Sequence, residues 1–408
     1  MMLLDGVRVI DWGLGQVGPY AAMLLGDLGA EVIKIEPRVT GDFMRGLDNF
    51  LSSSLWLADG RNTAFEAFNR NKKSVAVDLA KPEGREIVRD LVEKSDVFVS
   101  NYRLEAAERL GLDYASLREV NPKLIYAHAS CFGPQGPDAG KRGDDPTAQG
   151  RIGMMFSCSE PSDRPHFVAP GAGDAVTSMM LASAVQGALY AREKHGIGQA
   201  VTVSQVSTLM ALLRFQVMMA FLHGYKNAQM KMPPDDPVTA HSGWFRCKDG
   251  KWVFVSAAWT GERGWREICQ RIGQPQLIED PRFETIQLRL ANSAALKPII
   301  EAALATRTAA EWETAFAGFE GNFSRIRNDL SEMADDPQML ANNYVVEDDH
   351  PVLGRIKTLG VVPHFSETPG ELRMSPPELG QHTEEVLLEV LGYDWQRIGE
   401  LKELEAII

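Results

Sequence analysis

Strand-length apolar runs separated by helical patterns dominate residues 7–130, and they constrain the fold more than any other feature. The runs are Val7–Trp12, Glu31–Glu36, Ser74–Leu79, Val97–Asn101 and Lys123–Ser130. Helical patterns lie between several of them, as in Pro19–Leu28 and Lys81–Lys94. This alternation predicts βαβ units and a mostly parallel sheet, so the expected fold class is α/β. The runs are nearly continuous in apolar residues, as is typical of strands covered on both faces.

The rest of the chain predicts a second, smaller domain, since 408 residues exceed the size at which one core usually keeps growing. A long helix from about Ala175 to Lys194, a strand at Gln199–Ser204 and a helix from Thr208 to about Leu222 complete a large domain at 1–224. Gly224–Ala240 is rich in Pro and Asp and predicts a linker. A hairpin at His241–Ala257 and helices up to about residue 317 predict an α+β small domain at 225–327. Residues 328–408 return to α/β character and end in an amphipathic helical tail.

Charge and cysteine content exclude several classes of protein. The chain has 42 Lys and Arg against 55 Asp and Glu, a net charge of −13, which disfavours nucleic acid and anionic membranes as partners. The four cysteines, Cys131, Cys158, Cys247 and Cys269, form no CxxC pair, and no residue spacing indicates a metal site. We expect reduced cysteines in a cytoplasmic protein. No signal peptide is predicted, and the apolar stretch Val176–Ala191 is too short and too polar to span a bilayer.

The first βα turn contains a glycine motif that has two readings. Gly13, Gly15 and Gly18 form GxGxxG after a strand and before a helix, and Glu36 ends the next strand. This is the spacing of a dinucleotide-binding fingerprint, in which glycines let the backbone approach a phosphate at a helix N-terminus. Three glycines also suit a chain that only needs a tight turn. From the motif alone, nicotinamide binding and a purely structural role both remain open.

Basic residues gather after the predicted strand ends. They are Lys34, Arg38, Arg70, Lys72, Lys73, Arg103, Arg109, Lys141 and Arg142. Ligands of parallel sheets bind outside the carboxyl ends of the strands, so this set favours a cofactor with more than one phosphate. Each residue taken alone is more often a solvated surface charge.

Asp174 is the candidate nucleophile. It follows the small residues of Pro170-Gly-Ala-Gly at the start of the long apolar helix. We expect these neighbours to leave its carboxylate exposed, and the helix-end amides and macrodipole to stabilise its ionised form. An accessible carboxylate can attack an acyl group. The alternative is a structural helix cap, since Asp is a preferred N-cap residue.

With these residues assembled, the sequence resembles the class III CoA-transferase family, which includes formyl-CoA:oxalate and carnitine CoA-transferases and α-methylacyl-CoA racemases. The resemblance covers nearly the whole chain, at residues 3–37, 69–86, 108–137, 173–204, 336–341, 350–354, 365–371 and 379–393. The hairpin at 241–255 looks more like the carnitine-type branch. The run of glycines found in the middle region of formyl-CoA transferases is missing here.

The resemblance implies a fold and a set of site residues. The implied fold is a Rossmann-like large domain built from the N- and C-terminal parts, a small middle domain, and an interlocked ring-like homodimer. Asp174 matches the catalytic aspartate of the family. The positions that match its coenzyme A contacts are Gln16, Val17, Arg38, Val77, Asp78, Leu79, Asn101, Tyr102, Arg103, Arg109, Arg142, Gly143, Asp144 and Asp145. Many members read Glu-Arg-Pro where this chain reads Glu36-Pro37-Arg38, which makes the role of Arg38 less certain.

The function that the resemblance implies is CoA transfer from an acyl-CoA donor to a free carboxylic acid, through an anhydride and a thioester on Asp174, without a metal. The racemases resemble one another in a His where this chain has Asp144, so racemase-type proton transfer is the weaker alternative. An NAD-dependent oxidoreductase, resting on the glycine motif and Glu36, is the alternative of another class. A non-catalytic CoA-binding protein is the third. The identity of the acid substrate cannot be read from the residues.

Overall fold

The computed structural model describes the chain except for residues 58, 158–163, 227–237 and 239–240. Most of the predicted linker at 224–240, and Cys158, therefore lie outside the described residues. The chain divides into two compact units, Met1–Met230 with Ala341–Ile408 as unit 1 and Lys231–Leu340 as unit 2. The sequence prediction ends the small domain at 327, whereas this division ends unit 2 at Leu340.

A six-stranded parallel sheet forms the centre of unit 1. Its strands are β1 (Arg8–Trp12), β2 (Glu31–Pro37), β5 (Lys72–Val77), β6 (Val97–Ser100), β7 (Ile125–Ser130) and β8 (Gln199–Ser204). They lie in the order β5-β2-β1-β6-β7-β8, and every pairing is parallel. The chain therefore builds outward from β1 in both directions, which is a doubly wound order. Such a sheet places a ligand crevice where the order reverses, outside the carboxyl ends of β1 and β6.

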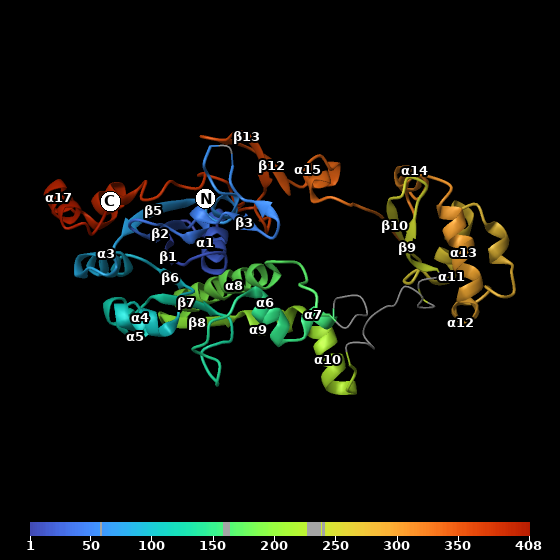
Figure 1. Cartoon of the computed structure of the whole chain (residues 1–408), viewed down its shortest axis with the longest axis horizontal. Coiled ribbons are helices and arrows are strands. Elements are labelled where there is room, and N and C mark those ends of the chain that lie inside the picture. The colour runs from blue at the N-terminus through green and yellow to red at the C-terminus, as the bar shows by residue number, and fades with distance from the viewer. Residues whose placement is uncertain (58, 158–163, 227–237, 239–240) are drawn as a thin grey trace. The chain divides into compact units, whose positions relative to one another are not determined.

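Helices cover both faces of this sheet (Figure 1). Those of unit 1 are α1 (Val17–Asp27), α2 (Thr63–Glu66), α3 (Pro82–Glu93), α4 (Leu104–Leu110), α5 (Tyr114–Val120), α6 (Asp145–Arg151), α7 (Met154–Ser157), α8 (Ala172–His195), α9 (Gln205–Leu212) and α10 (Arg214–His223). α1 and α8 pack on the face that buries Val9, while α3, α4 and α5 pack on the face that buries Ile10. Consecutive strand residues thus enter opposite cores, as their period of two requires.

The C-terminal segment packs against the N-terminal half of unit 1. Its elements are β12 (Val345–His350), β13 (Gly354–Leu359), α16 (Thr383–Val386), the π-helical turn η6 (Leu387–Leu391) and α17 (Trp395–Glu403). Leu387 and Leu401 join the same core as α3 (Figure 1). The amide of Ala76 donates to Thr383 Oγ1 at 3.1 Å, and the amide of Asp78 donates to the carbonyl of Ala406 at 2.8 Å. The C-terminal segment therefore covers the edge strand β5, which would otherwise expose unpaired backbone groups.

Unit 2 is an α+β unit with its own core. Its elements are β9 (Ser242–Arg246), β10 (Trp252–Ser256), α11 (Gly261–Arg271), η4 (Pro275–Ile278), α12 (Ile286–Ala291), α13 (Ser293–Leu304), α14 (Ala309–Ala315), β11 (Asn322–Ile326), η5 (Leu330–Met333) and α15 (Pro337–Ala341). β9 and β10 form the predicted antiparallel hairpin, and β11 adds a third strand. Trp265 and Trp312 lie in the buried core of this unit.

The predicted helix from Thr208 to Leu222 is two helices. α9 begins at Gln205, α10 begins at Arg214, and their axes bend by 81° at the break. Among the described residues no single helix is long and apolar enough to cross a membrane, although this bent pair passes that test when its two helices are combined. A short hairpin, β3 (Asn49–Phe50) with β4 (Ser53–Ser54), follows the 3-10 turn η1 (Phe43–Gly46) between β2 and β5.

Candidate active site

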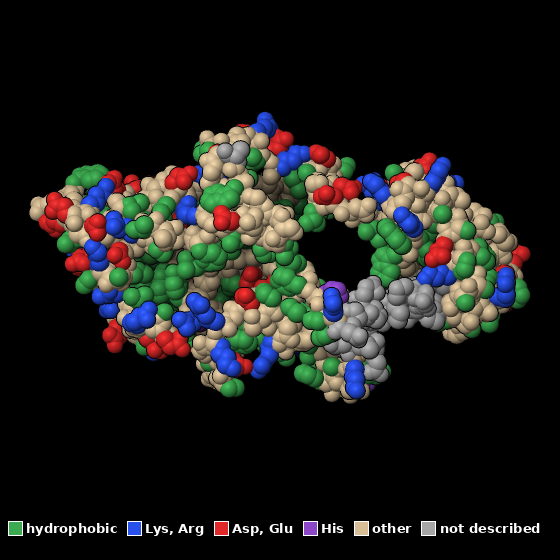
Figure 2. Space-filling model, viewed as in Figure 1, with side chains coloured by type: hydrophobic (Ala, Val, Ile, Leu, Met, Phe, Trp, Pro, Cys, Tyr) green, Lys and Arg blue, Asp and Glu red, His purple; other side chains and the backbone are tan. Residues whose placement is uncertain are grey.

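Two cavities lie at the carboxyl ends of the strands of unit 1. The first, of about 370 Å³, is lined by residues that follow β1, β2 and β5, among them Arg38, Asp78 and Leu79. The second, of about 420 Å³, is lined by the glycine turn after β1 and by Asp174. Tyr102 lines both cavities. Figure 2 shows an apolar strip on this face over β1 and β6, with basic side chains along its edge near α4 and α5 and acidic ones near α6 and α8.

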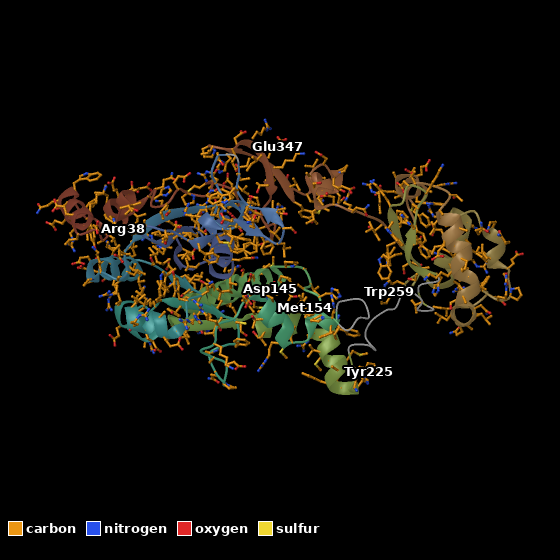
Figure 3. All side chains as sticks on the ribbon, in the orientation of Figure 1. Arg38, Asp145, Met154, Tyr225, Trp259 and Glu347 are labelled. Atoms are coloured by element: carbon orange, nitrogen blue, oxygen red, sulfur yellow. The ribbon has the colours of Figure 1, made fainter. Side chains whose placement is uncertain are left out.

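The two cavities bring together most of the predicted site residues. Arg38, Val77, Asp78, Leu79 and Tyr102 line the first, and Gln16, Val17, Asn101, Tyr102, Arg142, Gly143, Asp144 and Asp174 line the second. Arg103 and Arg109 are exposed and line neither, although Leu110, next to Arg109, lines the first. Asp145 lies behind the second cavity. Figure 3 shows Arg38 beside the C-terminal segment and Asp145 between α8 and α6.

The glycine turn is held by side chains from neighbouring loops. Asn101 accepts from the amide of Leu14 at 2.9 Å and donates to its carbonyl at 2.8 Å. The amide of Gly15, whose φ is +74°, donates to Asp42 Oδ1 at 3.1 Å. These bonds fix the turn that leads into α1. The amides of Val17 and Gly18 then open α1, where helix geometry gives them no acceptor within the helix. Of these two residues, Val17 lines the second cavity.

A buried charge network lies beneath this turn, and it corrects the predicted role of two lysines. Lys34 Nζ donates to Asp42 Oδ2 at 2.9 Å and to the carbonyl of Gly13 at 3.0 Å. Lys72 Nζ donates to Asp11 Oδ2 at 2.9 Å. Both lysines are fully buried, so neither can bind a phosphate. Burial lowers the pKa of Lys72 to about 8, whereas for Lys34 the carboxylates around it outweigh burial and raise the pKa.

Glu36 also belongs to this network. Arg45 donates to both of its oxygens at 2.8 Å, and Ser74 Oγ donates to Oε1 at 2.6 Å. Burial works against its ionisation, but the bond from Arg45 and the charge of Lys34 hold the pKa of Glu36 at about 2. The carboxylate of Glu36, the acidic residue of the dinucleotide-binding fingerprint, is therefore already held by protein groups, which weighs against a nicotinamide site.

Asp174 lies in the first turn of α8, whose N-cap is Gly171 with φ of +83°. Its side chain is half-buried, and Gln205 Nε2 donates to its Oδ1. Burial and the charge of Asp145 raise the pKa of Asp174 to about 7; the bond from Gln205 lowers it and the charge of Asp144 raises it further. The expectation of an exposed carboxylate whose ionised form is stabilised by the helix end is therefore wrong.

Asp145 explains why the helix end does not stabilise Asp174. Its Oδ2 accepts from the amide of Gly171 at 2.7 Å, and its Oδ1 accepts from the amide of Gly173 at 2.9 Å. The start of α8 thus already holds a carboxylate, which neutralises the positive end of the helix dipole. A Cβ at Gly173 would lie 2.3 Å from Asp145 Oδ1, so this contact requires glycine.

The carboxylate of Asp144 also has hydrogen-bond partners within the protein. It is the N-cap of α6, and its Oδ1 accepts from the amide of Thr147 at 3.1 Å and from the Thr147 hydroxyl. Its side chain is exposed and lines the second cavity beside Arg142. Its carboxylate therefore has a local structural partner, as an N-cap carboxylate usually does.

Sequence reasoning missed Gln205, Trp12 and Phe43 as lining residues. Gln205 begins α9 directly after β8, and Phe43 follows Asp42 in η1. Trp12 lines the first cavity and stacks on Tyr102, with ring centroids 4.2 Å apart. The available signal was position, since each of these residues follows or ends a strand at the binding edge or lies in a loop next to it.

Comparison with known proteins agrees with this architecture. Residues 4–383 match the model of CoA-transferase family III. The chain is 32% identical to succinyl-CoA--D-citramalate CoA-transferase of Chloroflexus aurantiacus, over 95% of this chain and 94% of that protein. It is also 32% identical to succinyl-CoA:glutarate CoA-transferase of Mus musculus, over 98% of this chain and 89% of that protein. A crystal structure of a CAIB/BAIF family protein from Brucella suis superposes with a TM-score of 0.82 at 28% identity, covering 95% of this chain and 99% of the other.

The family model spans well over half of the chain, and both relatives are similar over nearly their whole length. The parallel six-stranded sheet with cavities at its carboxyl edge fits the same assignment. The chain therefore belongs to CoA-transferase family III and is a class III CoA-transferase, an enzyme whose co-substrates are CoA thioesters.

Proposed function

We propose that the enzyme transfers CoA between carboxylic acids through covalent intermediates on Asp174. The observation that carries this proposal is that Asp174 lines the second cavity together with Gln16 and Val17 at the start of α1. Its pKa of about 7 leaves it ionised at mildly alkaline pH and more nucleophilic than an ordinary carboxylate.

The reaction consists of four acyl transfers. Asp174 attacks the donor thioester, and CoA thiolate leaves from an acyl-aspartyl anhydride. The thiolate attacks the Asp174 carbonyl carbon, releasing the donor acid and leaving an aspartyl-CoA thioester. The acceptor carboxylate displaces the thiolate, and the thiolate then takes the acceptor acyl group from Asp174. Each attack forms an oxyanion, and the amides of Val17 and Gly18 suit the one on the donor carbonyl.

The two cavities suggest how CoA would bind. Arg38 in the first cavity supplies a cation for the nucleotide phosphates, and Val77, Leu79 and Trp12 supply apolar contacts. The ion pair between Arg38 and Glu405, at 3.6 Å, lies at the surface and costs little to break. Tyr102 joins this cavity to the second, where the thioester would meet Asp174. We assign the nucleotide end to the first cavity and the thioester end to the second.

The alternatives have less support. A racemase base at position 144 would have to give up its N-cap bonds to Thr147, and a nicotinamide site would need Glu36, which is held by Arg45 and Ser74. The names of the two relatives make succinyl-CoA the first donor to test, with dicarboxylic acids as acceptors. Larger organic and aromatic acids are further acceptors to test, because the described lining of the second cavity has no feature that excludes them.

The enzyme is also proposed to work as a homodimer. α10 buries none of its residues, and it exposes Phe215, Phe221 and Leu222 by more than two thirds. Large apolar side chains exposed on one helix favour self-association. Sedimentation at micromolar concentration tests this proposal, and a monomer would refute it.

The deciding experiment incubates the protein with acyl-CoA donors and free acids and analyses both the CoA esters and the protein by mass spectrometry. We expect a new CoA ester and a hydroxylamine-trapped adduct on the Asp174 peptide. Asp174→Ala should bind CoA and turn over nothing. Retained turnover in that variant would refute the proposal, and α-deuterium uptake without ester exchange would indicate a racemase instead.

A further inference from the structure

Gln205 donates a hydrogen bond directly to the reacting carboxylate. It is only 3% exposed, and its Nε2 donates to Asp174 Oδ1. Because a carboxylate can only accept, the amide nitrogen rather than the oxygen must face Asp174. Asp174 Oδ2 has no recorded bond among the described residues, so the two oxygens of the nucleophile differ in their surroundings.

We propose that Gln205 is the donor that stabilises the oxyanion formed on Asp174 when its own carbonyl carbon is attacked. The inference rests on the proposed function and deepens it, because it assigns a different oxyanion donor to each of the two carbonyl groups of the anhydride. The α1 amides serve the substrate carbonyl, and Gln205 serves the enzyme carbonyl.

The chemistry follows atom by atom. Oδ2 forms the bond to the donor acyl carbon, and the thiolate leaves with the electron pair of the broken C–S bond. When the thiolate attacks Cγ, the π electron pair moves onto Oδ1 and a full negative charge develops there. Collapse restores the carbonyl and breaks the Cγ–Oδ2 bond, so the donor acid leaves as a carboxylate. The acceptor carboxylate attacks the same Cγ in the third step, and its oxyanion also forms on Oδ1.

The hydrogen bond therefore strengthens as the reaction proceeds. In the resting carboxylate the charge is shared between two oxygens, whereas in each tetrahedral intermediate at Cγ it resides on Oδ1. Only an interaction that is stronger in the transition state accelerates the step. Gln205 meets this condition in two of the four steps.

The side-chain oxygen of Gln205 also supports a functional role for this residue. Gln205 Oε1 is buried and has no hydrogen-bond partner among the described residues. A buried acceptor without a partner costs free energy, so an apolar side chain of similar size would suit the fold better. The start of α9 does not need the amide, since Ser204 and Ser207 form its capping box.

Gln205→Met tests the inference because Met has nearly the same length and no donor. Loss of one oxyanion donor typically lowers kcat by about 10²–10³-fold, and we expect that loss with the KM for acyl-CoA unchanged within about threefold. The matched control is Gln396→Met on the exposed face of α17, which should keep wild-type kcat. Melting curves and CoA titration verify that both variants fold and bind.

The pH dependence of kcat and the protein adducts distinguish a catalytic role of Gln205 from a purely structural one. The groups that face Asp174 are Cys131 at the end of β7, Asp144 and Asp145 on α6, and Gln205 on α9. Of these, only Gln205 lowers the pKa of Asp174, so Gln205→Met should move the acid limb of kcat to higher pH. With donor alone, intact-mass measurements should show slower formation of the CoA adduct and more acyl adduct than in wild type.

The outcomes distinguish the inference from the proposed function. If wild-type protein forms no adduct on Asp174, the proposed function fails whatever the variant does. If wild type forms both adducts while Gln205→Met keeps wild-type kcat and the same acid limb, the role of Gln205 is refuted. Should the Met variant fail to fold, Gln205→Asn, which shortens the amide by one methylene, takes its place with the same expected direction and the same refuting result.

Discussion

Replacing Asp174 with Asn should stabilise the protein at alkaline pH while abolishing CoA transfer. The pKa of the Asp174 carboxyl is raised from 3.8 to about 7 in the folded state. Between pH 3.8 and about pH 7, the folded state therefore holds a proton that the unfolded state has lost. The free energy of unfolding contributed by this group therefore falls as the pH rises from 4 to 7. Asn carries no charge at any pH and keeps an oxygen that can accept from Gln205.

The magnitude follows from the same shift. Each pKa unit corresponds to about 1.4 kcal/mol, so a rise from 3.8 to about 7 amounts to at most about 4 kcal/mol above pH 7. About 3 kcal/mol of this develops between pH 5 and pH 8.5. One kcal/mol moves the midpoint of a domain of 150–250 residues by about 2–4 °C, and less for the larger unit 1. The variant should therefore gain roughly 4 °C on wild type between these two pH values.

Differential scanning calorimetry at pH 5 and pH 8.5 measures this gain. Every other titrating group is common to both proteins, so the difference between them isolates Asp174. Glu403→Gln, an exposed carboxylate on α17, is the matched control and should show no pH-dependent difference. A variant that melts below wild type at pH 8.5, or an advantage that does not shrink at pH 5, would refute the reasoning.

Three further predictions concern the surroundings of Asp174 and the proposed CoA site. Asp145→Asn removes the second-largest cause of the raised pKa of Asp174, so the acid limb of kcat/KM should move down by about one unit; an unmoved limb in a pH–rate profile would contradict this. Gly173→Ala should lower the free energy of unfolding by about 1–3 kcal/mol and remove most of the activity, because the added methyl group collides with Asp145. The control Gly187→Ala, in the same helix, meets nothing within 4 Å and should raise the free energy of unfolding by up to about 1 kcal/mol. Equal melting midpoints of the two variants would contradict this argument. Arg38→Ala should weaken CoA binding about tenfold, most clearly at low salt, and an unchanged Kd in calorimetric titration would remove Arg38 from the site.

Most strands of the parallel sheet could be predicted from the sequence, because burial on both faces leaves an apolar run in β1, β2, β5, β6 and β7. β1, β2 and β8 begin and end within one residue of the predicted bounds. β5 begins two residues earlier than predicted, since Lys72 and Lys73 read as polar. Lys72 is nevertheless a buried strand residue, because Asp11 neutralises it from β1, two strands away in the sheet. Periodicity carries no information about such a partner.

The site was predictable as a set of chain positions but not as a set of contacts. Topology places the loops after β1, β5, β6 and β7 at one edge, so residues there could be named in advance. Whether a charge faces the ligand or the interior depends on tertiary partners, which is why Lys34 and Glu36 were assigned to a cofactor. For Gln205 the only signal in the sequence is its position after a strand, because an uncharged residue there is ordinary. Its role depends on the approach of α9 to α8, which only the fold supplies.

The two carboxylates at the start of α8 divide two tasks that one could not perform. A carboxylate that accepts from two backbone amides has its charge stabilised and its lone pairs occupied, so it attacks a carbonyl carbon poorly. Asp145 takes that position and holds the loop through the amides of Gly171 and Gly173. Asp174 is left with one donor and a raised pKa. The glycines are needed for this division, because a side chain at 173 would displace Asp145 and open the helix end to Asp174. In the mechanism that we propose, the reactivity of Asp174 therefore comes from a fold that gives the amides at the start of its helix to Asp145.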